Sequence, residues 1–229
     1  MSIFAVILAA SLANVSVPPG GSITVDTKSA NEWIGSHVTV QVWDRADVSV
    51  DQTVQGIAAS DVHPVVTRDG NTVTITADYT GERKSAFFGL IHEHDDDKSF
   101  TWVVHVPSKR ALNVRESNGG IDVHGVTAAL DLSTANGRIA VDGAGPSVAA
   151  KTANGTIDVK MQTLAGGPPN VDLHTSNGWI HLRVPRGFST RVAAHTSNGD
   201  VTNPFSDANG PGSATVRTSN GGIEVSSGQ

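Results

Sequence analysis

Apolar and polar residues alternate with a period of two over most of the chain. In the first half, six alternating runs are bounded by Gly, Asp, Asn or Pro, which is typical of β-strands. These runs cover residues 22–27, 38–43, 48–52, 62–67, 72–77 and 100–106. Asp69-Gly-Asn71 separates two of them and predicts a hairpin turn. No segment has a helical period, so the pattern predicts an all-β protein.

The second half contains six copies of a short motif centred on Asn-Gly, here numbered repeat 1 to repeat 6. Apolar residues stand four positions before the Asn and three and five positions after it, with few exceptions. Alternation on both sides of a turn predicts two strands joined at Asn-Gly, with these three positions facing inward. The asparagines of repeats 1 to 6 are, in order, Asn118, Asn136, Asn154, Asn177, Asn198 and Asn220.

Two architectures agree with this local pattern. Asn-Gly between alternating apolar residues is a strong hairpin signal, and hairpins would pair each repeat with itself. Alternatively, each repeat is one coil of a solenoid, with Asn and Gly supplying backbone freedom at a corner. A solenoid stacks equal positions about 4.8 Å apart, which explains why they recur in the same phase. The sequence therefore favours a right-handed parallel β-solenoid of about six Asn-Gly coils, preceded by an irregular β-sandwich-like N-terminal half.

Three segments follow from these patterns. Residues 1–13 resemble a signal peptide because an apolar run ends in small residues at Ser11 and Ala13, although no basic residue precedes the run. The alternative is that this segment forms a first buried strand. Residues 14–111 form the predicted N-terminal β region that caps the solenoid, and residues 112–229 form the repeats. The expected location is therefore secreted or at the bacterial cell envelope. No apolar run has the length of a transmembrane span.

A family resemblance rests on three pieces of sequence. They are the run of residues 42–50 (Val-Trp-Asp-Arg-Ala-Asp-Val-Ser-Val), the strand of residues 100–107 and the repeated Ser/Ala-Asn-Gly-x-Ile-x-Val motif. Together they resemble a bacterial putative-adhesin family of β-strand-repeat domains of unknown function, over roughly residues 20–229. This resemblance implies an envelope-exposed β-solenoid without catalytic residues.

Composition narrows the chemistry. The formal net charge of −6 disfavours non-specific nucleic-acid binding. The absence of cysteine excludes disulfides and thiolate metal sites. His92, Glu93 and His94 form the one cluster with metal-ligand chemistry, but neither their number nor their spacing predicts a specific metal site. No cofactor is implied.

The evidence for catalysis is weak. Solenoid enzymes that cleave polysaccharides need paired carboxylates or a metal site on one face. Four residues after the asparagines, in repeat order, the chain carries Asp122, Ala140, Asp158, His181, Thr202 and Glu224. The acids in this series are interrupted, which is typical of a solvated face. The sequence therefore predicts no catalytic residues and no enzyme.

The position three residues before each Asn is basic in five of the six repeats. Stacking would bring these residues into one outward column, interrupted only by Ser133, in a protein that is acidic overall. The predicted binding residues are Arg115, Lys151, His174, His195 and Arg217. Such a column could hold an anionic glycan or envelope surface, or it could be a solvated charged face. The six asparagines are expected to be structural, bonding from coil to coil.

Three functions remain open at the sequence level. The leading hypothesis is a non-catalytic extracytoplasmic solenoid that acts as an adhesin-like binding or scaffold module. The alternatives are a carbohydrate-active enzyme and a self-assembling scaffold. Self-assembly would use the last coil, Asn220–Val225, whose uncapped strand edges could pair with another chain.

Overall fold

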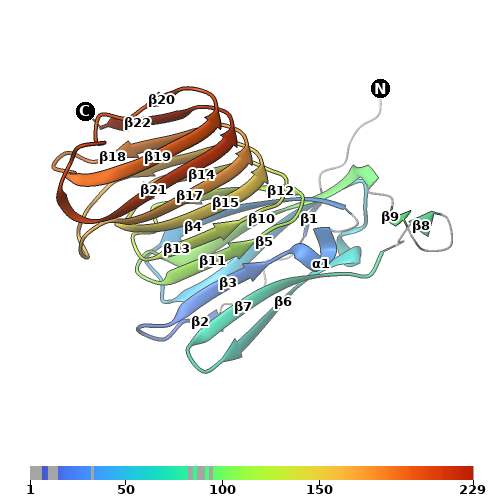
Figure 1. The fold of residues 1–229 in the computed structure, drawn as a ribbon. Coiled ribbons are helices and arrows are strands. Elements are labelled where there is room, and N and C mark those ends of the chain that lie inside the picture. Colours follow the sequence, from blue (N-terminus) through green and yellow to red (C-terminus); the bar gives the residue numbers. More distant parts are fainter. Residues whose placement is uncertain are drawn as a thin grey trace.

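The computed structural model describes residues 7–9, 15–31, 34–81, 85–86, 91–92 and 95–228. Within this part of the chain the protein is almost entirely β-structure, with one short helix, α1 (Lys28–Asn31), and one 3₁₀ turn, η1 (Ala59–Asp61). Two large sheets pack face to face and share one core (Figure 1). A separate hairpin pairs β8 (Ser85–Ala86) with β9 (Ile91–His92).

Sheet I carries the strand that follows Asn-Gly in each repeat. Its strands lie in the order β1 (Ile7–Ala9), β5 (Asp47–Gln55), β10 (Asp95–Pro107), β4 (Ile34–Trp43), β12 (Gly119–His124), β14 (Ile139–Ala144), β16 (Ile157–Met161), β18 (Ile180–Val184), β22 (Ile223–Ser227) and β20 (Val201–Thr202). The short strand β2 (Val15–Ser16) also pairs with β5. All neighbours from β10 to β20 are parallel.

Sheet II carries the strand that precedes or includes Asn-Gly. Its order is β19 (Thr190–Asn198), β21 (Gly210–Asn220), β17 (Asn170–Asn177), β15 (Ser147–Asn154), β13 (Leu130–Ser133), β11 (Ala111–Arg115), β3 (Ser22–Asp26), β7 (Thr72–Tyr79) and β6 (Val62–Asp69). All neighbours from β19 to β7 are parallel. The repeats therefore do not form self-paired hairpins.

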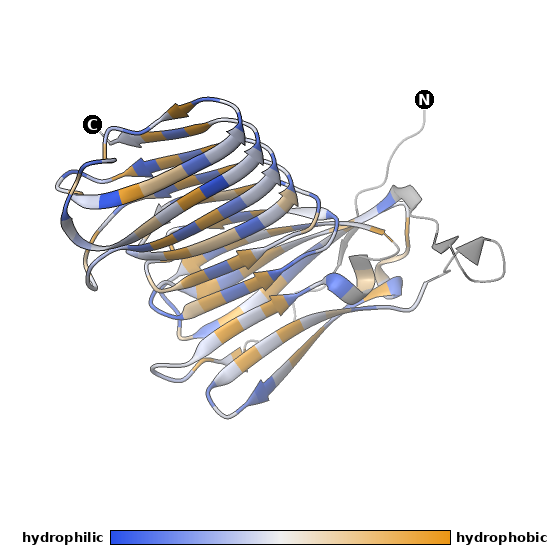
Figure 2. Cartoon of the chain, viewed as in Figure 1, coloured by the Kyte–Doolittle hydropathy of each residue, from blue (hydrophilic) through white to orange (hydrophobic). Residues whose placement is uncertain are grey.

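The core lies between the sheets and uses the predicted inward positions. Three residues after Asn, the apolar side chains of repeats 1 to 4 and 6 are at most 1% exposed, namely Ile121, Ile139, Ile157, Ile180 and Ile223. Figure 2 shows hydrophobic and hydrophilic positions alternating along the strands. Burying one such side chain contributes about 1.5–3 kcal/mol, and the column of five forms the centre of the stack.

The repeats do not stack in sequence order. Strands β21 and β22 of repeat 6 lie between repeat 4 and repeat 5 in both sheets. Repeat 5, with β19 and the two-residue strand β20, forms the end of the stack. The expectation that the last coil exposes its edges is therefore wrong, because β22 has a parallel neighbour on each side.

The N-terminal half continues both sheets. Strands β3 and β4 pair in parallel with β11 and β12, so the expected boundary between residues 111 and 112 falls inside the stack. The same half also places β3 between β7 and β11, out of sequence order (Figure 1). Strands β6 and β7 form the predicted hairpin, with Asp69 opposite Thr72.

Candidate binding surfaces

The asparagine side chains form one ladder along the corner of the stack. In repeats 2 to 6 the Nδ2 atom donates to the Oδ1 atom of the neighbouring repeat, at distances of 2.7–2.9 Å, in the spatial order of the repeats. Asn220 donates to Asn177, and Asn198 donates to Asn220. A primary amide both donates and accepts, so it can repeat this contact without limit.

A second ladder at the same corner was not foreseen. The residue two positions before Asn is Thr in five repeats, and its hydroxyl donates to the carbonyl of the Gly in the neighbouring repeat at 2.8–3.1 Å. These donors are Thr134, Thr152, Thr175, Thr196 and Thr218. Repeat 1 has Glu116 there, which accepts a hydrogen bond from Ser36 at 2.5 Å. The sequence feature that could have predicted this ladder is the recurring Thr-Ser/Ala-Asn-Gly motif.

The five basic residues form one row on the outer face of sheet II. Each is exposed, and each is paired in register with its neighbour, in the order His195, Arg217, His174, Lys151, Ser133 and Arg115. Arg217 therefore lies between the two histidines, because repeat 6 lies between repeats 4 and 5. Lys151 Nζ lies 3.2 Å from Asp172 Oδ2, and Arg115 Nε donates to Asn113. We call this surface the basic row.

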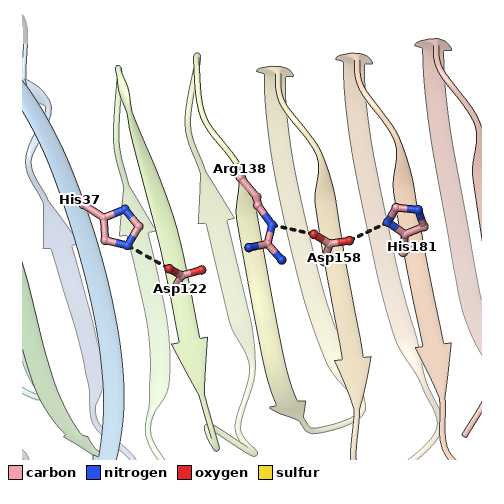
Figure 3. Close-up of polar contacts among 5 residues, drawn as sticks. All are labelled: His37, Asp122, Arg138, Asp158 and His181. Carbon is pink, nitrogen blue, oxygen red and sulfur yellow. Dashed lines mark hydrogen bonds and ion pairs between the residues drawn. The ribbon is translucent and has the colours of Figure 1, made fainter. Parts of the chain in front are cut away.

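The outer face of sheet I carries a different, mixed network. His37 Nε2 lies 2.9 Å from Asp122 Oδ2 on the adjacent strand. Asp158 lies between two partners, with Arg138 Nε at 2.7 Å and His181 Nδ1 at 2.6 Å (Figure 3). His37, Asp122, Asp158 and His181 lie on β4, β12, β16 and β18, and Arg138 directly precedes β14, so the contacts join segments far apart in the sequence.

A groove of about 640 Å³ lies on this face, over strands β12 to β22. In repeats 1 to 4 and 6, the outward residues four and six positions after Asn line the groove, together with Arg138. Lys160 Nζ pairs with Asp142 Oδ1 at 3.0 Å across two of these strands. We call this feature the sheet I groove. Its volume lies within the range of small-molecule sites.

The candidate catalytic acids do not stand as a free pair. Asp122 and Asp158 are separated by the strand that carries Ala140, and both contact cationic or imidazole partners. Within the described ranges no three His, Cys, Asp or Glu side chains could hold a metal ion together. The side chains of His92, Glu93 and His94 lie outside the described residues. No helix in the described part has the length and apolarity to cross a bilayer.

Comparison with protein families finds a match within the repeat region. Residues 125–226 match the model of the family described as Toastrack DUF4097. The matched segment is similar to the Toastrack domain and spans slightly less than half of the chain. It contains repeats 2 to 6, while repeat 1 and the N-terminal strands extend the same two sheets. A search of curated proteins found no significant match.

Two solved structures are similar to this protein at low sequence identity. A putative cell adhesion protein from Clostridium sporogenes ATCC 15579 superimposes with a TM-score of 0.53 and 9% identity, covering 99% of this chain and all of that one. A putative adhesin from Bacteroides fragilis NCTC 9343 matches with a TM-score of 0.40 and 8% identity, over 95% of this chain and 97% of that one. The first likeness shows a common all-β architecture.

Proposed function

We propose that this protein is a non-catalytic, adhesin-like binding module of the bacterial envelope. The basic row would contact an anionic glycan or another anionic envelope surface. The observation that carries this proposal is the register of the row, since five exposed basic side chains stand on strands stacked side by side.

The spacing of the basic row suits a repeating polyanion. Neighbouring strands lie about 4.8 Å apart, so successive cations meet successive charges along an extended polymer. Each exposed ion pair contributes about 0.2–1 kcal/mol and is screened by salt. Affinity would therefore come from several contacts made together. The shared fold of a putative cell adhesion protein supports a binding role.

Two finer features belong to the same proposal. The apolar run before Ala13 supports export, and fractionation of cells that express the full chain would test this location. We also infer that the repeats wind in a right-handed solenoid, because connections between parallel strands of one sheet are almost always right-handed.

The basic row can be tested with Arg115, Lys151 and Arg217 changed together to Ser. The wild type should bind polygalacturonate or phosphatidylglycerol vesicles, and the triple variant should bind about tenfold more weakly. A matched control changes Arg45, Arg68 and Arg186 to Ser, three exposed arginines outside the basic row. Binding would be measured by titration at low and physiological salt, with weaker binding expected at the higher salt.

Equal binding by the triple variant and the wild type, or no binding by the wild type, would show that the basic row is a solvated charged face.

A further inference from the structure

Trp179 lies on sheet I as an exposed aromatic surface. Its side chain is 49% exposed, although tryptophan is usually well buried. Five of the six repeats carry Gly, Arg, Thr or Asp at this position, and only repeat 4 carries an aromatic residue. The position of Trp179 is therefore not one of the repeated apolar positions that form the core.

Two neighbours lie against the indole ring. A Cβ atom on Gly222 would come within 2.3 Å of the Trp179 ring, so the ring covers this glycine of the adjacent strand. The His181 ring stacks beside it at 6.0 Å between centroids and 16° between planes. A fixed aromatic ring loses little conformational entropy when a ligand packs on it.

The polar groups next to Trp179 face the sheet I groove. His181 and Glu224 line the groove on adjacent strands and are paired in register. Asp158 is held by both Arg138 and His181. The groove thus contains carboxylates, imidazoles and a guanidinium that donate and accept hydrogen bonds, and the Trp179 ring stacks beside one of its lining residues, His181.

The charge of the groove selects the class of ligand. Its lining contains four carboxylates and three Lys or Arg side chains, so the charges nearly cancel. In the basic row on the opposite sheet, Lys151 pairs with Asp172, while the groove holds several carboxylates and cations together. A nearly neutral groove with many hydrogen-bonding groups favours an uncharged, polyhydroxylated ligand over a polyanion.

We propose that the sheet I groove, with Trp179 at its border, is a binding site for a neutral oligosaccharide. The apolar C–H face of a pyranose ring packs on the indole. Hydroxyl groups of the same sugar and its neighbours bond to Glu224, Asp158 and His181. The groove is open, so binding is reversible and strengthens with the number of sugar units. This inference does not rest on the proposed function, because it uses the opposite face and an uncharged ligand.

The test uses the full chain with chitotetraose, cellotetraose and maltotetraose, each titrated by calorimetry up to about 10 mM. At least one tetrasaccharide should bind and change the tryptophan fluorescence. Trp179→Ala should weaken that binding at least about tenfold, as expected for a central aromatic contact. Trp179→Phe should retain part of the binding. Glu224→Gln should weaken the binding. Neither substitution should alter the fold, because the side chains of Trp179 and Glu224 are exposed.

Trp43→Ala is the matched control. Trp43 also stacks on a histidine, His105, at 5.1 Å, but the guanidinium of Arg45 covers its ring at 4.5 Å. Binding should be unchanged in this variant and in the triple variant of the basic row. The proposal is overturned if none of the three sugars binds, or if Trp179→Ala binds as tightly as the wild type.

Discussion

The glycine of each Asn-Gly pair is required by contact between neighbouring repeats. A Cβ atom on Gly137, Gly155 or Gly178 would lie 2.0 Å from the carbonyl oxygen of the glycine in the preceding repeat, far closer than real Cβ atoms approach. At Gly155 the backbone is not in the positive-φ region. The backbone freedom that the sequence pattern suggested for a turn therefore does not explain why glycine is required at position 155. Close approach of two backbones is the reason.

Gly155→Ala should lower the free energy of unfolding by roughly 2–4 kcal/mol, because the added methyl must push two strands apart. Gly35→Ala is the control, since its Cβ would meet Ser99 and Lys98 at ordinary distances of 3.5 and 3.6 Å. Urea unfolding of both variants would measure the difference. Similar losses in the two proteins would contradict the contact explanation.

At the scale of one element, strand β20 departs from the apolar pattern of the other repeats. Val201 is 44% exposed, whereas Ile157 at the same position of repeat 3 is fully buried. Asn203 stands where the other repeats have Val or Leu, and its side chain donates to the Val192 carbonyl. Pro204 follows directly. A short strand followed by proline limits further strand pairing at the end of a sheet.

This difference predicts opposite outcomes for one substitution. Ile157→Asp should prevent stable folding, because an unpaired carboxylate would be buried at a cost of several kcal/mol. Val201→Asp, at the equivalent position of repeat 5, should change the free energy of unfolding by less than about 1 kcal/mol. Thermal melts followed by circular dichroism would compare the two. A large loss in Val201→Asp would mean that repeat 5 does not form the end of the stack.

At the scale of the whole molecule, the stack is assembled out of sequence order at both ends. Strands β3 and β4 lie between segments that follow them in the chain, and repeat 6 lies between repeats 4 and 5. Repeat 5 therefore reaches the rest of the stack through β21 and β22. Its own inward residues, such as Ala194 and Asn203, offer little apolar surface for another partner.

A chain cut after residue 209 should consequently lose order in repeat 5, although every residue of that repeat is retained. Amides of residues 190–202 should exchange quickly in the shortened protein, while those of repeats 1 to 3 stay protected. Hydrogen exchange with mass spectrometry would show this. If residues 190–202 stayed protected, repeat 5 would have taken the place of repeat 6 on repeat 4.

The alternation of apolar residues determined the all-β class, the strands of the first half and the inward phase of the repeats. Those properties are local, because a period of two assigns each side chain to one face of a sheet. The residues of the basic row were also predictable from the sequence, because residues at the same distance from Asn align when repeats stack in parallel. The recurring Thr of the Thr ladder is visible in the sequence. Its role is not, because the glycine carbonyl that accepts its hydrogen bond is identified only in the fold.

Only the tertiary structure decided which repeats are neighbours. The position of a residue relative to the Asn of its repeat predicts which row of stacked side chains it joins, but not which repeats lie next to each other. The six repeats share the same apolar positions, so the sequence does not reveal their spatial order. Trp179 shows the consequence. In sequence order its strand would adjoin repeat 5, where Asp200 stands, but in the fold it adjoins Gly222 of repeat 6. The glycine leaves room for the indole ring, and the sheet I groove acquires its aromatic border from that long-range packing.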